Sequence, residues 1–212
     1  LPPPGLCGPE DESGSVSAEN AEPSPEKREM SEQIVALGEF REFPKIPRLS
    51  RECIVTEKID GTNASVYVAE DGTVRAGSRT RWITPSDDNH GFAAWVSDHA
   101  GELRSGLGAG HHFGAWWGCG LQRGYGLTEK RFSLFNVSRW GDDATRPACC
   151  GVVPVLYRGM FDTFAIDGLL NTMREQGSVA APGFMRPEGV IVFHVAGNLM
   201  FKKTAEKDSE WK

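Results

Sequence analysis

The feature that most constrains the fold is the stretch NASVYVAEDGTVRAGS, residues 63–78, in which apolar and polar residues alternate on both sides of Asp71-Gly72. A period of two is typical of β-strands with one buried face, and Asp-Gly between two such runs predicts a tight hairpin. The fold must therefore contain an antiparallel strand pair, which excludes a purely helical protein.

The rest of the patterned sequence adds strands and two helical regions. Helical spacing of Phe92, Trp95, Val96, His99 and Leu103 predicts a helix in residues 91–107, and a second helix in residues 160–177 is expected to stop at Gly177. Five further segments are expected to be strands: residues 111–118, 132–140, 152–157, 188–194 and 199–203. The sequence thus predicts an α+β fold of mostly antiparallel sheets with flanking helices.

Residues 1–29 differ in composition from the rest of the chain. They are rich in Pro, Ser and Glu, and they carry seven acidic and two basic side chains, which accounts for most of the formal net charge of −6. Such a segment buries too little apolar surface to offset the entropy of ordering, so we expect a disordered acidic tail over 1–29 and a folded domain over 30–212. Because the remaining body is nearly neutral, the overall acidity does not exclude a nucleic-acid partner.

Targeting and cysteine patterns point to a reducing compartment. The chain has no secretory signal and no apolar run long enough to span a membrane. Its five cysteines include no C-x-x-C, and the adjacent pairs Cys149-Cys150 and His111-His112 would point to opposite faces of a strand, which disfavours zinc. We therefore expect a cytoplasmic protein.

Lys58 is the residue that raises a functional question. It lies in VTEKIDGTNASVYV, within a strand-like run, and is followed by Asp60 and Gly61. A lysine beside a strand is often only a solvated edge residue. A nucleophilic lysine must lose its proton, which an apolar environment or nearby cations favour. Attack on a nucleotide phosphate also needs cations for the phosphates and carboxylates for a metal ion, and Glu188 and Lys202 offer both.

Six segments, in order, resemble the motifs of covalent nucleotidyltransferases, the superfamily of DNA ligases, RNA ligases and capping enzymes. EKIDGTN resembles the nucleophile motif, and is most similar to that of ATP-dependent RNA ligases that seal nicks in duplex RNA. The others are AGSRT with Arg79, FGAWWG, FSLFNV with Phe135, PEGVIV with Glu188, and MFKK with Lys202. The resemblance covers residues 46–212 and implies an adenylyltransferase domain of the nucleotidyltransferase, ATP-grasp-like ligase fold.

The resemblance also implies a mechanism and a set of site residues. Lys58 would attack ATP to form lysyl-AMP, AMP would pass to an RNA 5′-phosphate, and a 3′-hydroxyl would then displace it in RNA repair. Glu188 would hold Mg²⁺ or Mn²⁺, Lys202 would neutralise the α-phosphate, and Phe135 would stack on the purine. Arg79 would bind a phosphate of the nucleotide or of the RNA end, Asn63 would reach the end being joined, and the backbone near Glu57 would face the adenine.

Two departures from the family pattern affect these expectations. Ala115 stands where the family usually has a glutamate near the ribose, so either Glu102 or another carboxylate compensates or catalysis is weakened. Only ten residues follow Lys202, which disfavours the ligase classes with an added C-terminal barrel and leaves RNA docking to another element or to a separate end-recognition protein. The loop containing Trp116, Trp117, Arg123 and Tyr125 is a candidate, although the tryptophans could equally be core.

Three alternatives to RNA ligation stay open at this point. One is a non-catalytic module that binds nucleotides or RNA ends, which Ala115 motivates. Another is ligation of DNA strands, and the weakest is capping-type transfer of GMP.

Overall fold

The computed structural model describes residues 25–26, 29 and 40–206. Residues 1–45 and 46–212 form two separate compact units. In the first unit, residues 40–45 are exposed and have neither helix nor strand. The predicted disordered tail lies almost entirely outside the described residues, and the boundary at residue 30 stays a prediction. Among the described helices, none is both long and apolar enough to cross a bilayer.

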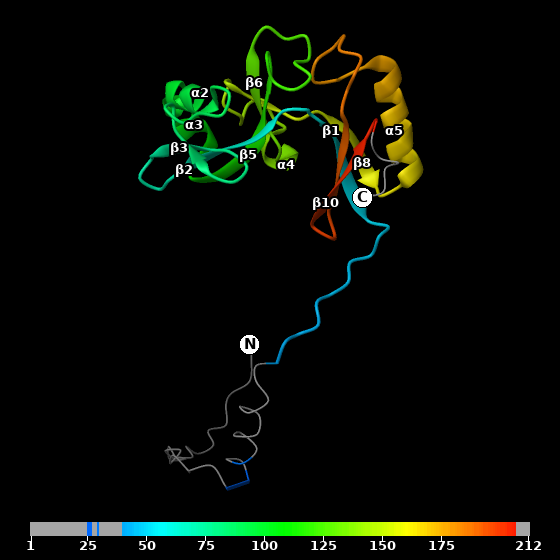
Figure 1. Cartoon of the computed structure of the whole chain (residues 1–212). Helices are drawn as coiled ribbons and strands as arrows, with labels where there is room; N and C mark the ends of the chain where they lie inside the picture. Colours follow the sequence, from blue (N-terminus) through cyan, green and yellow to red (C-terminus); the bar gives the residue numbers. More distant parts are fainter. Residues whose placement is uncertain (1–24, 27–28, 30–39, 207–212) are drawn as a thin grey trace, which may run out of the picture. The chain divides into compact units, whose positions relative to one another are not determined.

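The second unit contains two β-sheets (Figure 1). Sheet A has four strands in the order β10-β9-β1-β8, and sheet B has six in the order β4-β3-β2-β5-β6-β7. Every pairing is antiparallel except that of β6 with β7. The strands of sheet A are β1 (Glu52–Lys58), β8 (Val155–Met160), β9 (Gly189–His194) and β10 (Leu199–Thr204). Those of sheet B are β2 (Thr62–Val68), β3 (Val74–Gly77), β4 (Trp82–Ile83), β5 (Gly110–Gly118), β6 (Lys130–Leu134) and β7 (Cys150–Val152). The predicted fold class is confirmed.

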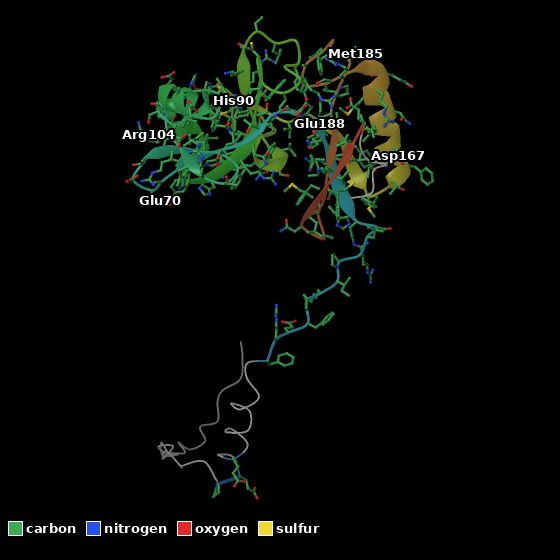
Figure 2. The ribbon with its side chains drawn as sticks, in the orientation of Figure 1. Glu70, His90, Arg104, Asp167, Met185 and Glu188 are labelled. Carbon is green, nitrogen blue, oxygen red and sulfur yellow. The ribbon has the colours of Figure 1, made fainter. Side chains whose placement is uncertain are left out.

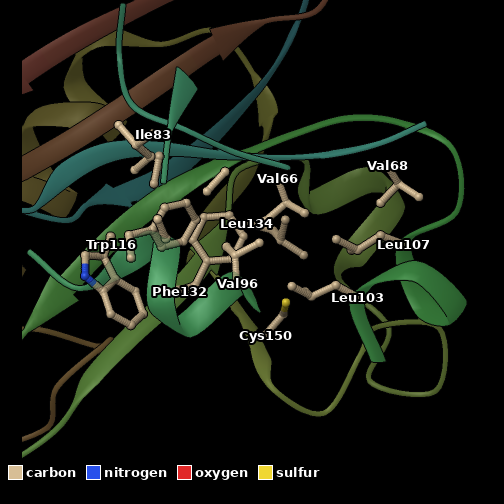
Figure 3. Packing of buried hydrophobic residues seen from close by; sticks show 14 of the residues in the cluster. Val66, Val68, Ile83, Val96, Leu103, Leu107, Trp116, Phe132, Leu134 and Cys150 are labelled. Carbon is tan, nitrogen blue, oxygen red and sulfur yellow. The ribbon is translucent and has the colours of Figure 1, made fainter. Parts of the chain in front are cut away.

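Sheet B has one face covered by helices and one face that no described helix covers. Helices α2 (Phe92–Asp98) and α3 (Ala100–Leu107) cover one face and pack on it in a large apolar core that includes Val66, Leu103 and Phe132 (Figure 3). Because side chains alternate along a strand, the opposite face carries the odd-numbered residues of β2 and β5. We call this the open face of sheet B; its members include Asn63, Ser65, Tyr67, His111, Phe113 and Ala115.

Sheet A is covered on one side by helix α5 (Thr163–Gln176), which packs on Val55, Val190 and Val192 (Figure 1). This helix begins where the Asp162 side chain accepts a hydrogen bond from the Phe164 amide, and it ends at Gly177 as predicted. The side chains of Thr56, Lys58, Ile191 and Lys202 alternate with those of the α5 side. We call this second side the Lys58 face of sheet A.

Three sequence predictions about continuous elements were wrong. Residues 152–157 are not one strand, because the chain leaves sheet B after Val152 and enters sheet A at Val155, with Pro154 between. The Val153 amide still bonds to Leu134, while the Pro154 carbonyl accepts from Glu57, so the segment is shared between the sheets. The helix expected in residues 91–107 is likewise two helices, since His99 between them has non-helical backbone angles.

Two short helical and hairpin details complete the unit. The β2–β3 hairpin turns at Asp71-Gly72 as predicted, with the Asp71 carboxylate accepting from the Thr73 amide at 2.8 Å. Residues 132–140 are not one strand as expected, because β6 ends at Leu134 and a four-residue helix, α4 (Val137–Trp140), follows. The Asn136 side chain accepts a hydrogen bond from the Arg139 amide and so starts this helix.

Candidate active site

Lys58 is the last residue of β1, on the Lys58 face of sheet A. Its amine donates a hydrogen bond to Glu188 Oε1, and the two side chains form an ion pair in which they are 23% and 18% exposed. Lys58 pairs with Gly189 in the sheet, so the register of β1 and β9 brings these residues together across 130 positions of sequence. The two residues that were predicted to work together are therefore neighbours (Figure 2 labels Glu188).

The second oxygen of Glu188 has a special position. Among the buried side-chain polar atoms of the described residues, Glu188 Oε2 alone has no hydrogen-bond partner. A buried carboxylate oxygen without a partner costs free energy unless a ligand or ion supplies one. A divalent cation is a partner that suits a hard carboxylate oxygen, so this atom fits the predicted metal role of Glu188.

Lys202 and Lys203 lie on opposite faces of sheet A. Lys202 pairs with Ile191 and so belongs to the Lys58 face. Lys203 pairs with Val190 on the α5 side, where its amine lies 2.5 Å from Asp167, the residue of α5 that Figure 2 labels. The register therefore places Lys202, and not Lys203, on the same face of sheet A as Lys58.

Asp60 is anchored by two residues of the β5–β6 loop. Its amide donates to Tyr125 Oη at 2.7 Å, and its carboxylate accepts from Arg123 Nε at 2.9 Å. Arg123 also donates to the Arg186 carbonyl and to the Glu206 carboxylate. This one guanidinium thus links the turn after Lys58 to the segment before Glu188 and to the end of the described chain.

This anchoring corrects the expected use of the β5–β6 loop. Arg123 is engaged inside the protein, and burial raises the pKa of Tyr125 so that its hydroxyl stays neutral. Trp116 and Trp117 are buried as well, and Trp117 donates to Ser133 Oγ at 2.9 Å. None of these side chains is available to stack on RNA. Sequence reasoning missed their role because the contacts join segments more than sixty residues apart.

Gly61 allows this turn to pass close to β5. A Cβ atom at this position would lie 2.6 Å from the Trp116 carbonyl oxygen and 2.8 Å from Trp117 Cβ. Both distances are too short for non-bonded atoms, so only glycine fits where the chain passes from β1 to sheet B. This gives a physical reason for the glycine of the K-x-D-G segment.

Glu57 supports the site from behind. Its buried carboxylate accepts from Ser178 Oγ at 2.5 Å and from the amides of Val179 and Ala180 at 2.9 and 2.8 Å. The side chain therefore fixes the segment that follows α5. Only the backbone of Glu57 is left to face a nucleotide, and that role stays a prediction.

The remaining predicted residues lie on or beside the open face of sheet B. Asn63 is exposed there and pairs with Ala115. Phe135, just after β6, is partly exposed, and its amide bonds to the Phe113 carbonyl. Arg79 is exposed in the β3–β4 turn and makes no hydrogen bond or ion pair with the described residues. The structure does not bring Arg79 into contact with Lys58 or Glu188.

Ala115 is buried, and Glu102 does not replace the expected carboxylate. Ala115 packs among Ile59, Trp117 and Tyr125. Glu102 lies on α3, which covers the other face of sheet B, and it accepts a hydrogen bond from the Cys149 amide at 2.7 Å. The compensation suggested for Glu102 was therefore wrong.

The thiols and imidazoles do not form a metal centre in the described part of the chain, where no group of three or more His, Cys, Asp or Glu could hold an ion. His112 points inward to the Gly108 carbonyl, and His111 belongs to the open face. All four described cysteines are free, and burial raises the pKa of Cys149 to about 11.

A comparison with families of known proteins decides the relationship. Residues 51–204 match the family model described as RNA ligase. The chain belongs to the RNA ligase family. The matched residues include every strand of both sheets, so the family assignment rests on the folded unit itself.

Solved RNA ligases have the same fold. Two mutants of the Naegleria gruberi RNA ligase with AMP and Mn superpose with TM-scores of 0.55 and 0.57, at 18% identity, covering 74% of this chain and 50% of theirs. A third mutant, with ATP and Mn, gives 0.54 at 16% identity, covering 74% and 49%. This RNA ligase family member thus spans about half the length of those proteins. No curated protein sequence matches it.

Proposed function

We propose that this chain is the adenylyltransferase part of an ATP-dependent RNA ligase and that Lys58 is its nucleophile. The observation that carries the proposal is the contact of the Lys58 amine with Glu188, whose other oxygen is buried without a partner among the described residues. Family membership and the AMP- and ATP-bound Naegleria gruberi ligases support the same reading.

The first step is an in-line displacement at phosphorus. The unprotonated Lys58 amine attacks the α-phosphorus of ATP, a P–N bond forms, the bond to the β-phosphate oxygen breaks, and pyrophosphate leaves while the amine proton goes to solvent. Lys202, on the same face of sheet A, neutralises the α-phosphate, and Phe135 stacks on the purine. Positioning and charge neutralisation are the contributions that a protein makes to such a reaction.

The later steps use the open face of sheet B. AMP passes from Lys58 to the 5′-phosphate of an RNA end, and a 3′-hydroxyl then attacks that phosphate and releases AMP. Asn63, exposed on this face, reaches the end being joined, and Arg79 binds one of the phosphates. RNA repair in the cytoplasm, with a separate end-recognition protein, is the setting that we propose for these steps.

Glu188 is the residue that would hold Mg²⁺ or Mn²⁺. Its unpartnered oxygen fits a hard cation, and the Naegleria gruberi ligases were solved with Mn. When bound, the ion supplies charge neutralisation at the phosphates. Because Glu188 also accepts from Lys58, this carboxylate holds the amine at the site before nucleotide binds.

The proposal predicts covalent labelling at Lys58. Incubation with α-labelled ATP and Mn²⁺ is expected to leave acid-labile AMP on the wild-type chain and none on Lys58→Ala. Glu188→Gln and Lys202→Ala are expected to lower labelling by roughly a hundredfold, since each removes a charged contact in the transition state. Lys203→Ala is the matched control: it removes the same charge from the adjacent residue on the other face, and labelling should be retained. Equal labelling of Lys58→Ala and wild type would refute the nucleophile.

Labelling, binding and nick-sealing assays on the wild-type chain separate the alternatives. Stoichiometric ATP or RNA binding without lysyl-AMP would identify a non-catalytic module, the alternative that Ala115 motivates because it carries no carboxylate. Preferential labelling by GTP would indicate capping-type transfer. Sealing of a nicked DNA duplex in preference to the matched RNA would indicate a DNA ligase.

A further inference from the structure

Four aromatic side chains form a continuous group on the open face of sheet B. They are Tyr67 of β2, Trp82 of β4, and His111 and Phe113 of β5, and we call them the aromatic platform. The Tyr67 and His111 rings are 4.7 Å apart, Trp82 and His111 are 5.4 Å apart, and His111 and Phe113 are 5.6 Å apart. No helix in the described part of the chain covers this group, because α2 and α3 pack on the opposite face.

The platform is open to solvent. Trp82 is 48% exposed and Phe113 is 58% exposed, and His111 is also exposed. Single exposed apolar side chains are common, but a contiguous aromatic group indicates an interaction surface. Gly77 contributes to its shape, because it has no side chain on the open face and the Trp82 ring lies beside it.

The aromatic platform lies next to the proposed site, farther along strand β2 from Asn63. Asn63, Ser65 and Tyr67 follow one another on the same face of β2. Phe113 pairs with Ser65, so the platform begins about 7 Å along the strand from Asn63. Arg75 pairs with Tyr67 and is exposed beside it, and Arg79 follows in the β3–β4 turn. Exposed rings with flanking guanidinium groups match the bases and phosphates of an unpaired nucleic-acid strand.

We propose that the aromatic platform binds the unpaired RNA strand next to the end that the enzyme joins. Bases stack on Trp82 and Phe113, while Arg75 contacts the backbone phosphates. This inference rests on the proposed function for the identity of the strand as RNA. It also supplies a docking surface within the folded unit, in place of the β5–β6 loop whose aromatic side chains are buried.

The test is binding of a fluorescently labelled 12-nucleotide single-stranded RNA to the full chain at fixed salt. Trp82→Ala and Phe113→Ala are each expected to weaken binding roughly tenfold, the amount that loss of one stacked base contributes. Arg75→Ala should weaken binding and reduce its salt dependence. Phe164→Ala is the matched control, because Phe164 is 86% exposed but lies on α5, and it should bind like wild type.

Lysyl-AMP formation, measured on the same variants, separates this inference from the proposed function. All four variants should label normally with ATP. Absence of labelling in the wild type would remove the proposed function, while the platform would still be judged by binding. Wild-type RNA affinity in both Trp82→Ala and Phe113→Ala would overturn the platform. Tighter binding of the matched DNA would also overturn it, as would variants that change self-association of the chain but not its RNA affinity.

Discussion

At the scale of single residues, His112 shows how burial controls a titratable group. Burial lowers the pKa of His112 below its ordinary value of 6.5, although the bond to the Gly108 carbonyl acts in the opposite direction. The unfolded chain therefore binds a proton near pH 6.5 that the folded chain resists. The free energy of unfolding must then fall as the pH drops below 6.5.

Replacement of His112 should remove this part of the pH dependence. His112→Gln keeps an N–H group for the Gly108 carbonyl but cannot titrate. Urea unfolding at pH 8 and pH 5.5 is expected to show a smaller loss of stability on acidification for His112→Gln than for wild type. His111→Gln, an exposed neighbour, is the control and should behave like wild type. An unchanged difference in His112→Gln would contradict the argument.

Ala115 is a second residue at which burial determines the effect of a substitution on stability. The position is 3% exposed and packs against apolar neighbours. Ala115→Glu would bury a carboxylate there, so we expect it to lower the free energy of unfolding by about 2 kcal/mol or more. Ala109→Glu, at an exposed position just before β5, should cost little. Denaturant unfolding measures both. A stable Ala115→Glu variant with faster AMP transfer would contradict this expectation and show that a glutamate at this position supports catalysis.

At the scale of elements, the β5–β6 loop anchors the turn that follows Lys58. Arg123→Lys keeps one charge but cannot reach Asp60, Arg186 and Glu206 together. We expect lysyl-AMP to form roughly tenfold more slowly, since a charged hydrogen bond of this kind contributes about 1.5 kcal/mol. The ATP affinity should change little, because the expected loss concerns the placement of Lys58.

Arg131→Lys provides the comparison for Arg123→Lys. Arg131 binds Glu129 at the surface, at the start of β6, and does not touch Asp60. Rates of labelling in single-turnover experiments should match wild type for this control. A slow Arg131→Lys, or a normal Arg123→Lys, would refute a positioning role for the loop.

Local patterns predicted individual elements well. The Asp71-Gly72 hairpin and the end of α5 at Gly177 follow from turn and capping chemistry, which depends on a few adjacent residues. The change of sheet at Pro154 could not be predicted in this way. The chain changes sheet there because Val155 pairs with Thr56, which lies 99 residues earlier. The local sequence contains no sign of this partner and looks like one continuous apolar run.

At the scale of the whole molecule, the predicted site residues came from family resemblance more than from pattern. The structure places Lys58 against Glu188 and puts Lys202 on the same face, through the register of three strands. Contacts between distant segments determine the roles of Arg123, Tyr125 and Glu57, so no local sequence pattern could predict these roles. Arg79 is exposed in the β3–β4 turn, and its expected phosphate-binding role stays a prediction.

The connection between the two sheets has one further consequence. Only residues 59–61 join β1 to β2, with Ile59 buried and Gly61 against Trp116. A single inserted residue would reverse the parity of β2, turning Asn63 toward the apolar core under α2 and α3 and exposing Val66. The length of residues 59–61 therefore sets both which side chains of β2 enter the core and which side chains reach the proposed site. Both requirements fix this length.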